Sequence, residues 1–302
     1  MEFFKTNTTI PFMRQRYHAS IFSIVIMLAS LVFLFVNGLN LGLDFTGGTK
    51  IEVSFKQAAD PAAVREVFQQ SAFPEAVVQA YDIHHLAIRV GVHKGMTQEK
   101  LRHEVMALVP KAHVQAMNFI GPQVGKQLMT NGVLAVVVAM LATIIYIALR
   151  FEYRFALSAA IGLLHDPILI LGVFAAFHLE FNLIVLAAVL TVLGYSLNDT
   201  IVVYDRVREN FRKLRHDTPS DVMDKSINQT LSRTIMTSSL TLLVVISLLI
   251  FGGDYLFGFA LALIIGIVIG TYSSIYVAGS LAITFGLSRD SLLKTVKRPD
   301  GY

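Results

Sequence analysis

The sequence of 302 residues contains no cysteine, and charged residues make up only 15% of it. Without cysteine, neither a disulfide framework nor thiol chemistry is available. A glycine-rich phosphate loop ending in Lys-Ser or Lys-Thr is also missing, which excludes ATP hydrolysis by that route. Because residues 38–128 offer no metal-ligand spacing and no nucleophile constellation either, we expect a protein that is not an enzyme and holds no metal or cofactor.

Apolar residues dominate instead, at 54% of the chain. Soluble domains of this length rarely reach such a proportion. Six apolar stretches are long enough to cross about 30 Å of hydrocarbon, and they cover residues 19–36, 131–149, 155–177, 183–203, 235–251 and 257–285. We therefore expect a polytopic α-helical membrane protein with six transmembrane helices.

Basic residues flank alternate spans and predict the orientation of the chain. They precede the first span, separate the second from the third, and follow the fourth and the sixth, at positions 14, 16, 150, 154, 206–215 and 289–298. Because cytoplasmic loops carry an excess of Lys and Arg, both termini are expected in the cytoplasm. This placement accounts for the net charge of +4, so we do not expect nucleic-acid binding. The first span lacks a small-residue cleavage site, which favours an uncleaved signal anchor.

The predicted topology has cytoplasmic ends at residues 1–18 and 286–302 and a first transmembrane helix at 19–37. A periplasmic domain follows at 38–128, and a five-helix membrane region at 129–285. The five-helix region includes a cytoplasmic amphipathic segment over residues 204–233. Within it, Thr218 is the expected cap of a helix that begins at Pro219. We expect this helix to contact membrane lipid at the cytoplasmic interface.

The segment between the first two spans has the pattern of a small folded domain. Strand and helix signals alternate as β-α-β-β-α-β over residues 50–55, 61–71, 77–82, 85–90, 98–108 and 113–119. Asp60 and Thr97 are the expected helix caps. That order is typical of a ferredoxin-like α+β fold. We interpret the domain as a binding module, since its scattered histidines favour surface or packing roles over a zinc site.

The chain enters this domain through Leu-Asp-Phe-Thr-Gly-Gly-Thr at residues 43–49. The adjacent glycines, Gly47 and Gly48, indicate a tight turn or a close backbone approach, and Asp44 can accept hydrogen bonds from nearby amides. A structural turn where the chain leaves the membrane is favoured over a ligand contact.

Asp199 places a carboxylate in the fourth span, beside Asn198, and that span contains no basic residue. An aspartate at the centre of a spanning helix costs roughly 2.5–3.5 kcal/mol even on the gentler insertion scales. Such residues usually face a protein interior or water and carry function. We therefore predict that Asp199 carries protons, with the proton as the coupling ion.

Arg233, near the start of the fifth span, is the predicted partner of Asp199. Asp199 precedes Asp205 by roughly 9 Å of helix, which places it in the cytoplasmic half of the membrane. A paired arginine would keep the carboxylate ionised, whereas separation in an apolar site favours the protonated acid, so alternation would be a proton switch. The alternative is a static buried ion pair that only fixes helix packing.

Further polar residues lie on the third and fourth spans. Tyr195 and Ser196 lie one turn before Asp199 and give an otherwise apolar helix a polar stripe. The third span contains His165-Asp166-Pro167, where proline removes a backbone donor and leaves a polar gap. We include Asp166 as a candidate member of the proton relay.

Small residues recur at every fourth position of the sixth span, among them Gly258, Ala262, Gly266, Gly270 and Ser274. Such a series allows another helix to approach closely. Because four-residue steps drift against the 3.6-residue turn, the stripe winds round the helix. We expect tight contacts within this chain or with another subunit.

Several longer motifs resemble those of one family. They are LDFTGGT, GYSLNDTIVVYD, RVREN, LSRT and SSIYV, at residues 43–49, 194–205, 206–210, 231–234 and 273–277. Over nearly its whole length the sequence is similar to the SecF family of protein translocase subunits, which belongs with SecD in the resistance-nodulation-division superfamily. The run GYSLNDT is far longer than a chance motif.

The resemblance implies an accessory complex in a bacterial inner (plasma) membrane. Such a complex uses the proton gradient to help secreted polypeptides through the SecYEG channel. The family's membrane aspartate falls on Asp199 and its partner arginine on Arg233, while Asp166 and the pair Asp205 and Arg206 match with less definite roles. The chain would supply one six-helix half of a pseudo-twofold core, which implies a SecD-like partner.

Two other functions remain open. One is half of a proton-driven exporter of small molecules or lipids in the same superfamily. Such an exporter would need a large outside domain with a substrate cleft, and residues 38–128 are few for that purpose. The other is a structural scaffold that stabilises a translocase without moving ions.

Overall fold

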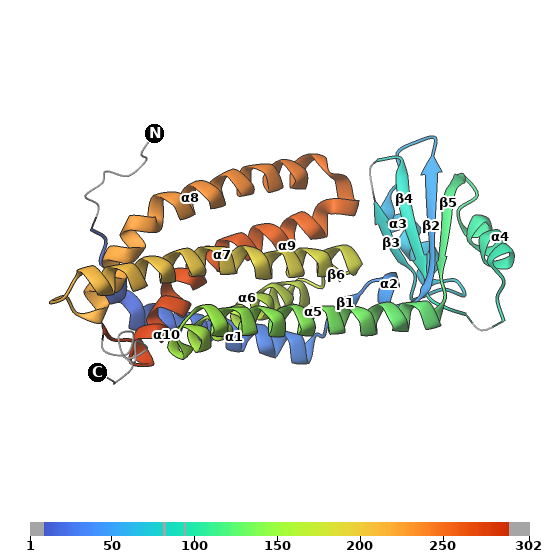
Figure 1. Ribbon diagram of the computed structural model, residues 1–302. Coiled ribbons are helices and arrows are strands. Elements are labelled where there is room, and N and C mark those ends of the chain that lie inside the picture. The colour runs from blue at the N-terminus through green and yellow to red at the C-terminus, as the bar shows by residue number, and fades with distance from the viewer. Residues whose placement is uncertain (1–8, 81–82, 94, 290–302) are drawn as a thin grey trace.

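The chain folds into a long helical bundle with a small α+β domain at one end (Figure 1). The structure is a computed structural model, and it describes residues 9–80, 83–93 and 95–289. The predicted strand end at Asp82 and the outer parts of both predicted cytoplasmic ends, residues 1–8 and 290–302, lie outside the described residues.

Six helices of the described chain are long and apolar enough to cross a membrane, which confirms the predicted number. The first five are α1 Arg16–Val36, α5 Pro122–Arg150, α6 Tyr153–Ala176, α7 Leu183–Lys213 and α8 Pro219–Phe251. The sixth is continuous across α9 Gly253–Tyr272, the π-helical segment η2 Ser273–Ala278 and α10 Gly279–Thr284. A short 3-10 turn, η1 Phe12–Gln15, precedes α1.

Local capping explains where the two longest helices begin. The Asn182 side chain accepts a 3.0 Å hydrogen bond from the Val185 amide at the start of α7. Thr218 and Asp221 form a capping box at the start of α8, with Pro219 in the first turn, as the sequence predicts. Both helices are longer than their apolar stretches. Polar residues extend α7 at its C-terminal end, to Lys213, and α8 at its N-terminal end, from Pro219.

The α+β domain contains β2 Gly48–Phe55, α3 Pro61–Gln69, β3 Val77–Ala80, β4 His85–Val90, α4 Gln98–Leu108 and β5 Ala112–Ile120. This element order agrees with the predicted one, and Asp60 and Thr97 cap α3 and α4 as predicted. The strands form one sheet in the order β3-β4-β2-β5, and all neighbours are antiparallel. Its core includes Ile51, Phe68 and Leu86, which are fully buried.

A two-stranded sheet lies where the bundle meets the α+β domain. The strands β1 Asn40–Leu41 and β6 Glu180–Phe181 pair in parallel, although they are far apart in sequence. The short helix α2 Leu43–Thr46 follows β1 and packs on α5, which runs on from the domain into the bundle (Figure 1). These contacts tie the domain to the loop between α6 and α7.

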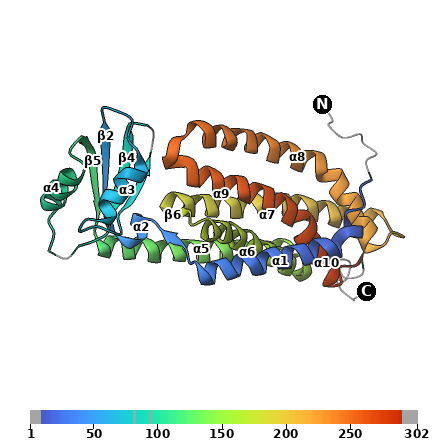
Figure 2. The same cartoon turned by 180° about the vertical axis from the view of Figure 1, so that it is seen from behind.

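Helices α6 and α7 are the most buried of the spans, whereas α1, α5 and α8 expose most of their apolar side chains. Figure 2 shows α1 running along α6 on one side of the bundle.

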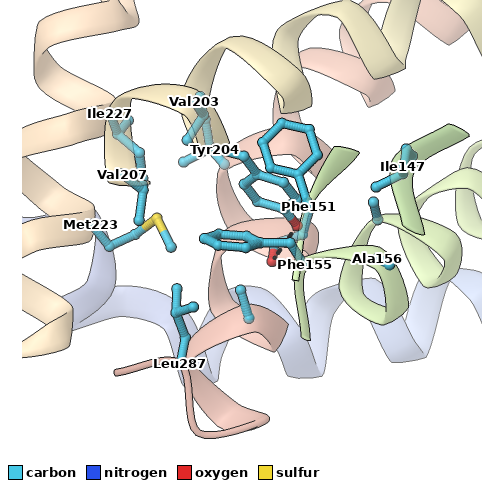
Figure 3. Close-up of a cluster of buried hydrophobic side chains, with 14 of the residues drawn as sticks. Ile147, Phe151, Phe155, Ala156, Val203, Tyr204, Val207, Met223, Ile227 and Leu287 are labelled. Atoms are coloured by element: carbon cyan, nitrogen blue, oxygen red, sulfur yellow. Dashed lines mark hydrogen bonds between the residues drawn. The ribbon is translucent and has the colours of Figure 1, made fainter. Parts of the chain in front are cut away.

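The end of the bundle opposite the α+β domain has its own apolar core (Figure 3). There the fully buried Tyr204 packs on Phe155, with ring centroids 4.5 Å apart, and donates a 3.2 Å hydrogen bond to the Ala278 carbonyl.

Candidate functional site

Asp166 of α6 lies at the centre of a buried polar cluster. Its side chain is fully buried, and its Oδ2 accepts hydrogen bonds from Ser196 of α7 at 2.5 Å and from Ser273 of η2 at 2.9 Å. The other oxygen, Oδ1, lies 2.9 Å from Nδ1 of His165. Because buried carboxylates require such partners, this one residue holds three helical segments together.

His165 contributes a buried imidazole ring to the same cluster. Its ring is buried, and Nε2 has no hydrogen-bond partner among the described residues. His165 and Asp166 therefore form a buried polar pair among apolar helices.

Asp199 lies three residues after Ser196 on α7, and only 3% of its surface is exposed. Its Oδ2 has no hydrogen-bond partner among the described residues. The carboxylate interacts with the side chain of Asn198 and, at longer range, with the charge of Arg233. A buried carboxylate with an unsatisfied oxygen is costly to keep ionised, so Asp199 is an unusual residue for this position.

Arg233 of α8 is exposed and makes no ion pair within 4.0 Å with Asp199 in the part of the chain that the structure describes. The static buried ion pair considered from the sequence is therefore not formed in this structure. Arg233 acts on Asp199 only through its electric field, since no direct bond holds the two side chains together.

The other polar residues predicted for this site are spread more widely. The Tyr195 hydroxyl lies 3.5 Å from that of Ser238 on α8, and Asn198 is exposed. Asp205 forms an ion pair with Arg150 of α5 at 3.0 Å, and both side chains are partly exposed. Arg206 pairs with an acidic residue of its own helix. The structure thus does not bring Asp205 and Arg206 into contact with Asp199.

The predicted stripe of small residues packs α9 and η2 against α7. A Cβ atom added at Gly266 would lie 2.2 Å from Cγ2 of Val192, and one added at Gly270 would lie 3.0 Å from the Cβ of Ser196. Gly258 meets α7 in the same way, and Ala262 and Ser274 are fully buried. The close contacts predicted from this stripe are therefore made within the chain, and they seat η2 beside Ser196.

The entry motif forms a tight turn beside α5. Gly47 and Gly48 have φ values of 74° and 141°, and a Cβ atom at Gly48 would lie 2.6 Å from the Val90 carbonyl oxygen. The predicted turn is therefore present. Asp44 accepts a 2.9 Å hydrogen bond from the backbone amide of Leu183, the first residue of α7. The sequence predicts a nearby amide as its partner, whereas the actual partner is 139 residues away.

Sequence reasoning missed Ser273 as a partner of Asp166. Ser273 follows the α9 stripe and opens the segment SSIYV, and this segment forms the π-helical turn η2. Such turns occur often at functional sites. The consecutive serines in an apolar helix are the signal that could have suggested a polar contact here.

Two family models match parts of this chain. The family model described as protein export membrane protein SecD/SecF, C-terminal, matches residues 100–288, and the SecD/SecF GG motif matches residues 32–59. The chain belongs to the SecD/SecF family. The larger match covers Asp166, Asp199 and Arg233, and the smaller covers the entry motif.

Two relatives are similar to this chain over almost its full length. The protein translocase subunit SecF of Vibrio alginolyticus is 43% identical, with 98% of this chain and 96% of that protein covered. The protein translocase subunit SecF of Escherichia coli O157:H7 is 40% identical, with coverage of 96% and 92%. Relatives named as translocase subunits indicate a role in transport rather than in catalysis.

Two solved SecDF structures share the fold. The crystal structure of SecDF from Thermus thermophilus, titled a translocon-associated membrane protein, has a TM-score of 0.85 and 35% identity. It is matched over 93% of this chain and 39% of that chain. SecDF in a super-membrane-facing form has a TM-score of 0.73 and 34% identity, with 98% and 41% covered. The chain thus spans about two fifths of the SecDF chains it matches.

Proposed function

We propose that this chain is an accessory subunit of the Sec protein translocase. Together with a SecD-like partner it uses the proton-motive force to promote export of polypeptides through SecYEG. The observation that carries this proposal is the buried, partly unsatisfied carboxylate of Asp199, one helical turn from a hydroxyl that bonds a second buried carboxylate, Asp166.

Proton movement through this site supplies the free energy. One proton that crosses 100 mV releases about 2.3 kcal/mol, which is enough to bias a two-state conformational equilibrium. When Asp199 takes up a proton, its attraction to Arg233 disappears and α7 and α8 are free to shift. Asp166 and His165 form the second proton-accepting group, and Ser196 connects it to the helix that carries Asp199.

The same proposal assigns an orientation and a partner. Both termini lie in the cytoplasm of a bacterial cell, the bundle spans the inner membrane, and the α+β domain is a ferredoxin-like binding module in the periplasm. The basic residues that flank alternate spans support this orientation. Coverage of only about two fifths of the SecDF chains supports a separate SecD-like subunit that supplies the remainder.

The test is gradient-dependent export in membrane vesicles that contain the complete complex. Asp199→Asn keeps the shape of the side chain but cannot carry a proton, so stimulation of export by the proton gradient should be lost while the complex still assembles. Glu209→Gln, at a partly exposed carboxylate of the same helix, is the matched control and should behave like the parent. Full stimulation in the Asp199→Asn complex would refute the proposal.

A further inference from the structure

An ion pair joins the α+β domain to the membrane bundle. Arg89 of β4 pairs with Glu180 of β6, which lies in the loop between α6 and α7. Only 16% and 17% of these side chains are exposed, so both charges are largely shielded from water. Arg89 also donates a 2.8 Å hydrogen bond to Gln79 of β3, which fixes the direction of its guanidinium group.

The backbone around Glu180 is held as firmly as its side chain. Glu180 pairs with Asn40 in the β1–β6 sheet, and the Gly42 amide donates a 2.9 Å hydrogen bond to the Phe181 carbonyl. A Cβ atom at Gly42 would lie 2.7 Å from Oε1 of Glu180, so the carboxylate passes directly over this glycine. Two residues later Asn182 caps α7. Glu180 is therefore connected to the start of α7 with little freedom.

A second contact reaches the same helix end. Asp44 accepts its hydrogen bond from Leu183, and a carboxylate is favourable there because the N-terminus of a helix carries a partial positive charge. Asp44 belongs to the segment that continues through Gly47 and Gly48 into the sheet of the α+β domain. The domain thus holds the first turn of α7 at two points.

We propose that Arg89, Glu180 and Asp44 form a strut, a set of positioning residues that makes the α+β domain move together with α7. The inference rests on the proposed function, because α7 also carries Ser196 and Asp199 of the proton site. A displacement of α7 on protonation is transmitted through the strut to the domain, since the ion pair and the helix cap connect the two directly.

The contacts favour a strut that stays closed over a latch that opens in each cycle. Opening would break this largely shielded ion pair and the hydrogen bond that Leu183 donates to Asp44. It would also separate the ring of Phe45, next to Asp44, from that of Phe181, next to Glu180, and these rings stack with centroids 5.9 Å apart. The strut therefore transmits movement and does not regulate it by release.

Charge reversal separates the role of the ion pair from general stability. In complexes with the partner subunit, Arg89→Glu or Glu180→Arg alone should lower gradient-dependent export by about fivefold or more, the usual minimum for coupling between two sites. Proton uptake should continue in both. The exchange of the two charges in one chain should restore export. Arg102→Glu, at an exposed position of α4, is the matched control and should leave export unchanged.

The absence of native cysteine allows a second test with a covalent bridge. Arg89→Cys combined with Glu180→Cys should reduce export like the single reversals. Bridging the two thiols with a short bifunctional reagent should then restore it, and cleavage of the bridge should remove the gain. A latch would instead be blocked by the bridge, so inhibition, or failure to restore export, would overturn the strut.

These outcomes are separable from failure of the proposed function. If the parent complex shows no proton uptake that depends on Asp199, the proposed function itself is wrong. If the parent takes up protons normally but single reversals at Arg89 and Glu180 export polypeptide at the parental rate, only the strut is wrong.

Discussion

Ser196 donates a hydrogen bond of 2.5 Å to Asp166 and lies three residues before Asp199 on the same helix. Residues three apart share one face of a helix, so the hydroxyl that bonds Asp166 lies on the same face of α7 as Asp199. It also packs on Gly270, where a larger residue would collide with it. A change of protonation at either carboxylate therefore changes the contacts of α7 and of the α9 segment that packs against it.

Arg233→Ala should separate electrostatic coupling from structural support. Because Arg233 is exposed and has no close contact with Asp199, its removal should change the free energy of unfolding by less than about 0.5 kcal/mol. Gradient-dependent export should nevertheless fall, since the field that favours ionised Asp199 is lost. Both quantities are measured on the purified complex. A buried structural ion pair would instead cost about 3–5 kcal/mol when broken.

Ser196→Ala and Ser273→Ala should each destabilise the bundle by about 0.6–2 kcal/mol, the range for interhelical hydrogen bonds in membranes. Both hydroxyls donate to the same oxygen of Asp166, so the two losses should not be additive. A double-mutant cycle from reversible unfolding in mixed micelles measures the interaction. Strict additivity would show that the two serines act independently.

Gly266→Ala should force α9 away from α7, because its new Cβ would overlap Val192. Overpacking of this kind typically costs about 1–3 kcal/mol. Val192→Ala provides room, so the double variant should be less destabilised than the sum of the single variants. Gly194→Ala is the control, since nothing lies within 4 Å of a Cβ there. Equal losses at Gly194 and Gly266 would refute this account of the α7–α9 contact.

Gly48→Ala should loosen the edge of the α+β domain nearest the membrane. The substitution combines a positive φ with a contact to the Val90 carbonyl, and strain of the backbone alone costs about 1–3 kcal/mol. Faster hydrogen exchange in β2 and faster proteolysis of the domain should report the change. Gly91→Ala, in open space in the same domain, should leave both rates unchanged.

Features fixed by local chemistry could be predicted from the sequence. The six spans follow from the length of apolar stretches, and the caps Asp60, Thr97 and Thr218 follow from the side chains that satisfy free amides at helix starts. The basic residues at 206–215 predict a helical extension of the fourth span, and α7 does continue to Lys213.

Contacts between distant segments could not be predicted. Ser273 meets Asp166 across 107 residues, and Leu183 meets Asp44 across 139. No local pattern pairs such residues, since only the packing of α6, α7 and η2 brings them together. The sequence did identify Asp199 and Arg233 as exceptional residues, but their separation depends on how α7 and α8 pack.

Proton uptake by sealed vesicles that contain the chain and its partner subunit tests the central claim most directly. An imposed membrane potential should drive proton uptake into the parent vesicles, and Asp199→Asn should abolish it, while Glu209→Gln should retain the parental rate. Uptake that is unchanged by Asp199→Asn, or absent from the parent complex, would contradict the account.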